Sequence, residues 1–263
     1  MDLDDAYANH THIPGADDYP PRWDEAARSF RQRLGAVNRA RLAIPYGPKT
    51  RNELDLFLPL GKPEGLLIFV HGGYWRRFGR GDWSHFSDGA LLSHWAVAMP
   101  SYTLCPEATI PEITDEVTQA VIRAAEELPD MPIRLAGHSA GGHLVARMLE
   151  PGRLPDAVAS RIEAVMPISP VADLEPLLRT SINDDLRLDE DTARAESPIH
   201  QPKPKRPVTV WVGADERPAF LDQARWLAEA WDAQLEIEDG RHHFDVIDGL
   251  ADPESAMMRR LLG

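Results

Sequence analysis

A serine stands at the centre of a glycine-rich motif of the form G-x-S-x-G, GHSAG at residues 137–141. A strand-like run, IRLAG, covers residues 133–137, and a helical pattern resumes at residue 140. A serine at such a sharp strand-to-helix turn presents its hydroxyl at a helix N-terminus, where backbone N–H groups favour developing negative charge. This context predicts Ser139 as the nucleophile of an acyl transfer and disfavours the alternative, a chance glycine-rich turn.

A second glycine motif, HGGYW at residues 71–75, follows the apolar run LLIFV at residues 66–70. Glycines at the end of a strand let the backbone approach a bound oxyanion. The N–H of Gly72 or Gly73, together with that of Ala140, is therefore the expected oxyanion hole. His71 is expected to brace this loop by hydrogen bonds rather than to transfer protons.

The acid and the base are expected after later strands. Asp215 lies just past the strand-like run PVTVWVG, and its carboxylate could fix the tautomer of a histidine. Glu216 is the alternative acid, but the position two residues after the strand-ending glycine favours Asp215. Between His242 and His243, the interpretation selects His243, which adjoins Phe244, as the base. The order Ser139, Asp215, His243 is the serine–acid–histidine order typical of a nucleophile-elbow hydrolase.

The residues after the second glycine motif offer candidates for substrate binding. Tyr74 and Trp75 are expected to line the substrate pocket, with Trp83 as a further candidate and packed core aromatics as the alternative. Arg76, Arg77 and Arg80 form a basic spot that is either a solvated turn or a site for a substrate carboxylate.

Motifs for metals and cofactors are missing from the sequence. It contains no H-E-x-x-H, no P-loop and no G-x-G-x-x-G, and Cys105 is its single cysteine. We therefore expect no catalytic metal held by the protein, no cofactor and no intrachain disulfide.

Strand-like and helical patterns alternate along the chain, which predicts an α/β fold: a mostly parallel sheet of about eight strands with helices on both faces. The strand-like runs are residues 54–58 (half-exposed by their alternation), 66–70, 96–100, 133–137, 163–169, 207–213 and 234–238. The helical patterns are residues 23–34, 84–93, 111–128, 140–150, 218–232 and 251–262. We expect a single domain over residues 1–263. Residues 1–35 form an N-terminal arm, irregular up to residue 22, and the Pro- and charge-rich residues 170–206 form a cap-like insertion.

The charge balance limits the classes of partner. Among 263 residues, 28 Lys and Arg stand against 42 Asp and Glu, a net charge of −14. Nucleic acids and anionic membranes are bound by clustered cations, so both are disfavoured and a small-molecule substrate is expected. The acidic N-terminus is unlike a secretory signal, and no apolar run is long enough to span a membrane. These features predict a cytoplasmic protein and leave a homodimer open.

Five segments together resemble the kynurenine formamidase (arylformamidase) branch of the α/β hydrolases. They are HGGYW at 71–75, YTLCPE at 102–107, GHSAGGHL at 137–144, GADE at 213–216 and HHFDVID at 242–248. Residues 173–189 resemble the cap of bacterial formamidase-like proteins. The resemblance implies the α/β-hydrolase fold, the triad of Ser139, Asp215 and His243, and the oxyanion hole of Gly72, Gly73 and Ala140.

The resemblance implies the hydrolysis, through an acyl-enzyme, of an N-formyl arylamine such as N-formylkynurenine. A carboxylesterase for short-chain acyl esters would use the same triad and is the main alternative. A non-catalytic binding protein on a hydrolase fold is a second alternative, and the presence of all three triad residue types disfavours it.

Overall fold

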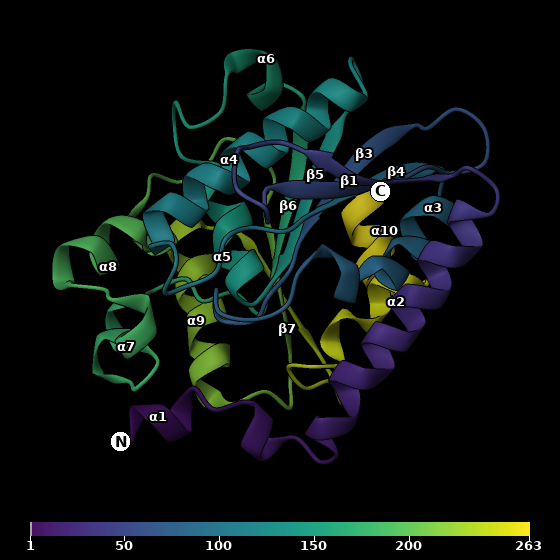
Figure 1. Cartoon of the computed structure of the whole chain (residues 1–263). Helices are drawn as coiled ribbons and strands as arrows, with labels where there is room; N and C mark the ends of the chain where they lie inside the picture. The colour runs from purple at the N-terminus through teal and green to yellow at the C-terminus, as the bar shows by residue number, and fades with distance from the viewer. Residues whose placement is uncertain (1) are drawn as a thin grey trace.

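The predicted apolar runs form one eight-stranded sheet at the centre of the computed structural model, which describes residues 2–263 (Figure 1). The strands are β1 (Ala40–Pro45), β2 (Glu53–Phe57), β3 (Gly65–Val70), β4 (Trp95–Pro100), β5 (Ile133–His138), β6 (Ile162–Ile168), β7 (Thr209–Gly213) and β8 (Gln234–Glu238). Their order across the sheet is β1-β2-β4-β3-β5-β6-β7-β8. The β1–β2 and β2–β4 pairs are antiparallel and the other pairs are parallel. The expected mostly parallel sheet is confirmed.

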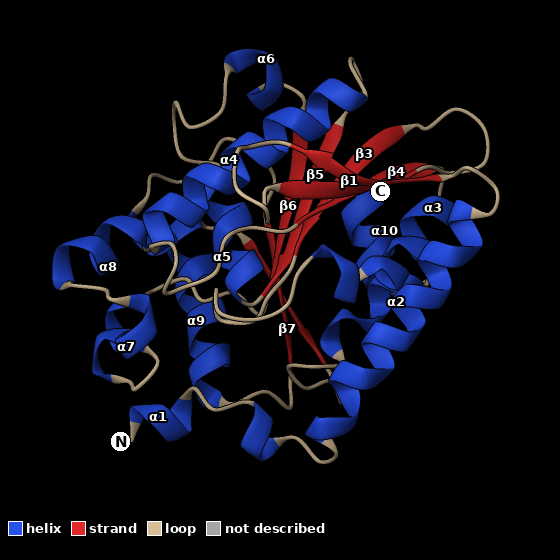
Figure 2. Ribbon diagram, in the orientation of Figure 1, coloured by secondary structure: helices blue, strands red, loops and turns tan. Residues whose placement is uncertain are grey.

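Helices cover both faces of this sheet (Figure 2). One face packs on α2 (Tyr19–Gly35), α3 (Asp88–Leu92) and α10 (Ala256–Leu262), and the other on α4 (Ile110–Glu127), α5 (Ala140–Arg147) and α9 (Pro218–Trp231). The short helices are α1 (Leu3–Ala6), α6 (Asp156–Ala159), α7 (Asn183–Leu186) and α8 (Glu190–Glu196). Turns of 3₁₀ helix lie at His10–His12, Ala16–Asp18, Arg80–Asp82, Ser84–Ser87, Glu175–Arg179, Pro198–His200 and Val246–Ala251.

Alternate residues of the strands feed two separate cores, because successive side chains of a strand point to opposite faces of the sheet. Leu66 and Ile68 of β3 belong to the core beneath α4, α5 and α9. Leu67 and Phe69 belong to the core beneath α2, α3 and α10. All six residues of β3 are buried, as expected for a central strand that is covered on both faces.

Several element boundaries differ from the expectation. β1 was not predicted, since most of its residues are exposed at the sheet edge and give no apolar pattern. β2 is buried from Leu54 onward rather than half-exposed, because helices lie over both of its faces. α2 begins at Tyr19, inside the stretch expected to be irregular, since prolines at residues 20 and 21 fit the first turn of a helix. The pattern at 84–93 divides into a 3₁₀ turn and α3, and α10 begins only at Ala256.

Two segments lie beside the carboxyl end of the sheet, where the loops after the parallel strands gather. Because Tyr19–Gly35 of the predicted arm form the regular helix α2, we keep the name arm for residues 2–18 alone. We call residues 170–206 the cap. The arm runs from α1 past the start of α9 to the start of α2, and the cap carries α7 and α8 (Figure 1). Across residues 2–263 no helix combines the length and the apolar character needed to cross a membrane.

Candidate active site

Ser139 lies between the end of β5 and the start of α5, in a backbone conformation that side-chain-bearing residues rarely adopt. Its φ is 55° and its ψ is −116°. The N–H of Ser139 donates to the carbonyl of Ile168 at 2.8 Å, and the N–H of His143 donates to the carbonyl of Ser139 at 3.1 Å. Such strain costs roughly 1–3 kcal/mol and persists only where the surroundings hold it. The geometry is that of a nucleophile elbow.

The glycines on either side of Ser139 allow this turn to pack. A Cβ at Gly137 would lie 2.2 Å from the carbonyl oxygen of Gly141, and one at Gly141 would lie 2.0 Å from that of Val70. Real Cβ atoms do not make contacts that short, so any larger residue would push α5 away from β3 and β5. The two outer positions of the G-x-S-x-G motif are therefore fixed by close packing.

His243 is held by a buried carboxylate. Its Nδ1 lies 2.6 Å from Oε2 of Glu216, whose side chain has no exposed surface. The other oxygen, Oε1, accepts hydrogen bonds from the N–H of Gly213 at 3.0 Å and from the hydroxyl of Ser169. An Nδ1–H that donates to the carboxylate leaves Nε2 with a free lone pair, which is the tautomer that a general base requires.

The prediction of Asp215 as the acid is wrong. Asp215 is exposed, and its backbone N–H bonds to the carbonyl of Arg241 at 2.9 Å. The turn after β7 directs residue 215 to solvent and residue 216 inward, where the longer Glu216 side chain folds back over Gly213. His242 also lies apart from this acid, since its Nε2 meets the hydroxyl of Tyr19 at 3.1 Å. The structure thus places His243, and not His242, against the carboxylate.

The HGG loop runs alongside the nucleophile. A Cβ at Gly72 would lie 2.8 Å from the carbonyl oxygen of His138 and 3.1 Å from the Cβ of Ser139. Gly73 has a φ of +109°, and a Cβ there would lie 2.6 Å from the carbonyl oxygen of Arg77. In the part of the chain that the structure describes, the N–H groups of Gly72, Gly73 and Ala140 have no hydrogen-bond acceptor of their own. Three free donors beside a serine are the arrangement that stabilises an oxyanion.

His71 and Tyr102 brace this loop from inside the core. His71 Nδ1 lies 2.8 Å from the carbonyl oxygen of Gly72, and the hydroxyl of Tyr102 donates to the carbonyl of His71 at 3.0 Å. The two rings are stacked with centroids 4.3 Å apart. Burial lowers the pKa of His71 to about 3, so the imidazole is neutral at physiological pH. This arrangement fits the expected bracing role of His71.

His138, the variable residue before Ser139, touches His243 directly and was not singled out from the sequence. Its Nε2–H donates to the carbonyl of His243 at 2.9 Å, and the two imidazole rings are 4.6 Å apart. Burial, with the neighbouring His243, holds the pKa of His138 well below its ordinary value. A neutral His138 therefore helps to fix the position of His243 and adds no charge beside its ring.

Ser139 and His243 open into one cavity of about 310 Å³, within the size range of small-molecule sites. Its walls are mainly aromatic, from Tyr7, Trp23, Tyr74, Phe78, Trp83 and Phe244. The arm contributes Tyr7, Ala8, Asn9 and His10, and the cap contributes Ile182. The cavity is suited to a flat aromatic molecule that projects a carbonyl toward Ser139.

Only one of the two aromatic residues predicted after the glycines lines this cavity. Tyr74 does, but Trp75 has no exposed surface and packs edge-on against His143 with ring centroids 5.1 Å apart. The prediction of Trp75 as a substrate-binding residue is wrong. Positive φ angles at both Tyr74 and Trp75 turn the second ring into the core. Trp83, Trp23 and Phe78 supply the aromatic wall instead.

The three arginines after the HGG loop have different roles. Arg80 is paired with Glu53 at 2.6 Å and Asp55 at 2.8 Å, so its charge is satisfied within the fold. Arg76 bonds Asp185 of the cap at 2.6 Å. Arg77 lines the cavity, lies over the Phe78 ring, and has no carboxylate partner among residues 2–263. Arg77 is thus the one of these three arginines without a carboxylate partner in the described part of the chain.

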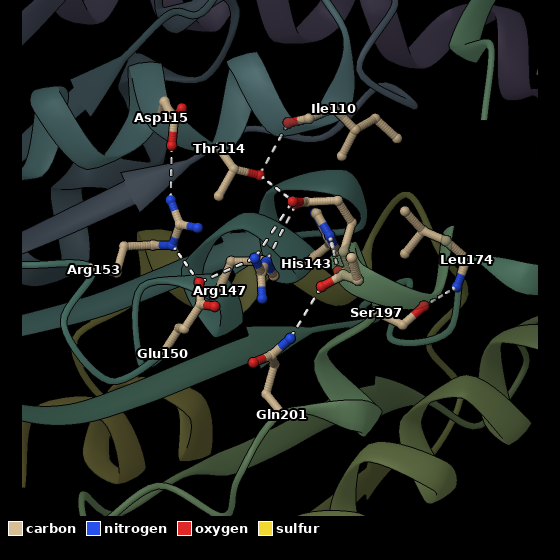
Figure 3. Close-up of polar contacts among 12 residues, drawn as sticks. Ile110, Thr114, Asp115, His143, Arg147, Glu150, Arg153, Leu174, Ser197 and Gln201 are labelled. Carbon is tan, nitrogen blue, oxygen red and sulfur yellow. Dashed lines mark hydrogen bonds and ion pairs between the residues drawn. The ribbon is translucent and has the colours of Figure 1, made fainter. Parts of the chain in front are cut away.

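A buried cluster of charged groups fastens the cap to α5, the helix that begins directly after Ser139 (Figure 3). Arg147 of α5 pairs with Glu196 of the cap at 3.2 Å and with Glu150 at 3.0 Å. The hydroxyl of Thr114 donates to the Glu196 carboxylate at 2.9 Å, and His143 Nε2 meets the Glu196 carbonyl oxygen at 2.8 Å. These bonds offset part of the cost of burying the charges, since Arg147 Nη1 has no hydrogen-bond partner among residues 2–263, and they fix the cap relative to Ser139.

One group of side chains has the spacing of a metal site, and it lies outside the cavity. The ligand atoms of Asp173, Glu175 and His200, all in the cap, lie within 4.8 Å of one another. Glu175 is already engaged with Arg194 at 3.4 Å and with His200 at 3.3 Å. None of the three lines the cavity of Ser139, so this group has no part in the chemistry there.

The similarity of this chain to known proteins agrees with the elbow, the histidine–carboxylate pair and the sheet order. Residues 67–197 match a family model described as the alpha/beta hydrolase fold. The chain belongs to the α/β-hydrolase family. It is a hydrolase, as its relatives are.

Relatives of this hydrolase carry two kinds of name. A kynurenine formamidase from Danio rerio is 28% identical, over 94% of this chain and 89% of its own length. A solved structure from Silicibacter sp. TM1040, called a "putative thioesterase", is 58% identical, covers 100% of both chains and superposes with a TM-score of 0.97. The esterase of Pyrobaculum calidifontis has a TM-score of 0.71 at 17% identity, covers 94% of this chain and 91% of its own, and shows the shared fold alone.

Proposed function

We propose that this hydrolase uses Ser139, His243 and Glu216 as a catalytic triad to hydrolyse N-formyl arylamines such as N-formylkynurenine. The observation that carries the proposal is the 2.6 Å contact between His243 and the buried Glu216, beside a strained Ser139 in an aromatic cavity. The reaction needs no cofactor, because an acyl transfer of this kind uses only the side chains and the backbone.

The chemistry proceeds in two halves. Glu216 holds the Nδ1–H of His243, and Nε2 takes the proton of Ser139 as Oγ attacks the formyl carbon. The N–H groups of Gly72, Gly73 and Ala140 stabilise the oxyanion. Nε2 then gives its proton to the leaving arylamine, and a formyl-enzyme ester remains. Water, deprotonated by the same nitrogen, releases formate and regenerates Ser139.

The shape and charge of the cavity favour this substrate class. A formyl group places only a hydrogen on the acyl side of the carbonyl, so the cavity is left for the leaving group. The rings of Trp23, Phe78 and Trp83 offer flat surfaces to an aryl amine, and such contacts contribute about 0.5–1.5 kcal/mol each beyond area burial. Arg77 would bind a carboxylate on the same molecule. The name of the Danio rerio relative supports the same choice.

Hydrolysis of a short-chain ester or thioester is the second candidate. It is favoured by the name of the 58% identical relative, and the same triad would perform it. The two candidates differ in the leaving group. A formanilide leaves as an amine that must be protonated by His243, whereas a 4-nitrophenolate or a thiolate leaves without such help.

A side-by-side comparison of kcat/KM tests the proposal. The substrates are N-formylkynurenine, 4-nitrophenyl acetate and an acetyl thioester, with the same enzyme and buffer. We expect the formamide to be the best substrate although its bond is intrinsically the least reactive. Ready hydrolysis of the ester or thioester with no turnover of N-formylkynurenine would reject the formamidase assignment and favour the second candidate.

A further inference from the structure

We propose that the arm, residues 2–18, is the wall that sets the largest substrate this cavity accepts, and that a clasp of exposed polar contacts holds it there. The inference rests on the proposed function in one respect, that Ser139 is the nucleophile. It adds a determinant of specificity far in sequence from the triad.

The arm closes the cavity with four consecutive residues, Tyr7 to His10, in the same space as Ser139 and His243. Tyr7 is buried, and its carbonyl accepts a hydrogen bond from the hydroxyl of Tyr74 at 2.7 Å. Its ring meets Phe220 with centroids 5.9 Å apart, and Phe220 in turn lies 4.3 Å from the His243 ring. The wall is therefore only one ring removed from the base.

A buried amide, that of Gln223 in α9, bonds to both the arm and the cap. Its Nε2 donates to the hydroxyl of Tyr7 and to the carbonyl of Asp173, each at 2.8 Å. Its Oε1 accepts from the N–H groups of Ala172 and Asp173, each at 2.7 Å. All the hydrogen-bonding capacity of this side chain is used. Gln223 thus fixes the position of Tyr7 in the arm relative to Ala172 and Asp173 in the cap.

Outside this buried anchor, the arm is held by contacts at the surface. Asp4 accepts from the N–H of Ser181 in the cap at 2.6 Å and from its hydroxyl at 2.9 Å. Asp5 pairs with Arg217, at the start of α9, at 2.6 Å, and also with His12 of the arm itself at 2.7 Å. We call these contacts of Asp4 and Asp5 the clasp. Exposed ion pairs are individually weak, so the clasp can be loosened without disturbing the core.

Three other lining residues lack this freedom. Trp23 lies on α2, Ser139 at the head of α5 and Trp83 in the core beside β3, and all three are buried. Ala8, by contrast, is a small, half-buried residue on the arm that lines the cavity. The width of the cavity is therefore set on the arm side by a small side chain and by how firmly the clasp holds.

Two organophosphates that differ only in bulk test the proposal without a natural substrate. They are diethyl and dibenzyl 4-nitrophenyl phosphate. Ser139 Oγ forms a bond to phosphorus as the bond to 4-nitrophenolate breaks, and the serine proton passes to His243. One nitrophenolate is released per labelled enzyme, and its absorbance gives the rate for each probe. Mass spectrometry of the peptide that contains Ser139 confirms the position of the label.

Two variants should change the ratio of the dibenzyl rate to the diethyl rate in opposite directions. Asp4→Ala/Asp5→Ala loosens the clasp and should raise the ratio about threefold or more. Ala8→Leu adds apolar bulk to the wall and should lower it about tenfold, as extra methylenes in a filled pocket do. In the Asp4→Ala/Asp5→Ala variant, whose two residues do not line the cavity, the diethyl rate should stay within about twofold of wild type. Asp24→Ala/Glu25→Ala removes two exposed ion pairs of α2 with Arg28 and is the matched control, with an unchanged ratio.

The outcomes separate this inference from the proposed function. An unchanged ratio in either arm variant, with Ser139 labelled normally, would overturn the inference alone. If the diethyl probe leaves Ser139 of the wild-type protein unlabelled, the proposed function fails and the inference falls with it. Thermal unfolding of each variant verifies that the compared proteins are folded.

Discussion

The Nδ1 atom of His243 lies 2.6 Å from the Oε2 atom of Glu216, and both side chains are buried. The neighbouring Asp215 is exposed and turns away from this contact. Of these two adjacent carboxylates, only that of Glu216 contacts His243. Substitutions at the two positions should therefore change the activity to very different extents.

Glu216→Gln should lower kcat by roughly 10⁴-fold, because the amide no longer fixes the tautomer of His243. Asp215→Asn, the same change one residue earlier, should leave kcat within about twofold. Steady-state rates on N-formylkynurenine measure both variants. The assignment of the acid is wrong if Asp215→Asn is the more damaging substitution.

Arg77→Ala should raise KM for N-formylkynurenine about tenfold or more, because a charge-assisted hydrogen bond to the substrate carboxylate is lost. Its effect on formanilide, which has no carboxylate, should be small. Arg28→Ala, which removes an exposed arginine of α2 away from the cavity, is the control. Equal losses on both substrates would mean that Arg77 shapes the cavity and does not bind a carboxylate.

Tyr102→Phe should lower kcat about fivefold with little change in KM, since it removes only the hydrogen bond to the His71 carbonyl, worth about 1 kcal/mol. The loop that carries Gly72 and Gly73 would then be held less firmly in the transition state. Tyr46→Phe removes a hydroxyl that bonds the carbonyl of Ser101, outside this loop, and is the matched control. A purely structural role for Tyr102 would lower the melting temperature and leave kcat unchanged.

His143 should make the protein less stable in mild acid. Burial lowers its pKa from 6.5 to about 3 in the folded state, so between these pH values the unfolded chain binds the proton and the folded chain does not. The stability that depends on neutral His143 is complete above pH 6.5 and is lost as the pH falls toward 3. The loss is about 2 kcal/mol between pH 7 and pH 5.

Urea unfolding at the two pH values measures this effect. The free energy of unfolding should fall by about 2 kcal/mol less in His143→Gln than in the wild type. His94→Gln, at an exposed histidine, should behave like the wild type. The same pH dependence in His143→Gln and the wild type would contradict the account.

Sequence patterns identify those site residues whose neighbours in the chain fix their geometry. Ser139 sits in a turn that only glycines at 137 and 141 permit, so the motif and the structure coincide. The choice between Asp215 and Glu216 depends on how a three-residue turn folds back over Gly213, and no local pattern encodes that direction. Position in the chain favoured the wrong neighbour.

The cavity walls were harder to predict, because they come from distant segments. Trp75 follows the glycines in sequence but turns into the core, whereas Trp23 and Tyr7 reach the cavity from the other end of the chain. The edge strand β1 was missed for a related reason, since its exposed residues have no apolar pattern. Alternation of buried strands and helices predicted the sheet well, because burial on both faces leaves continuous apolar runs.

The kcat of Ser139→Ala tests the central claim most directly. The variant should fold with the melting temperature of the wild type or a higher one, since the substitution removes only a hydroxyl from a strained turn. Its kcat on N-formylkynurenine and on 4-nitrophenyl acetate should fall by roughly 10⁴-fold or more. Turnover within about tenfold of wild type on either substrate, in a folded variant, would contradict the assignment of Ser139 as the nucleophile.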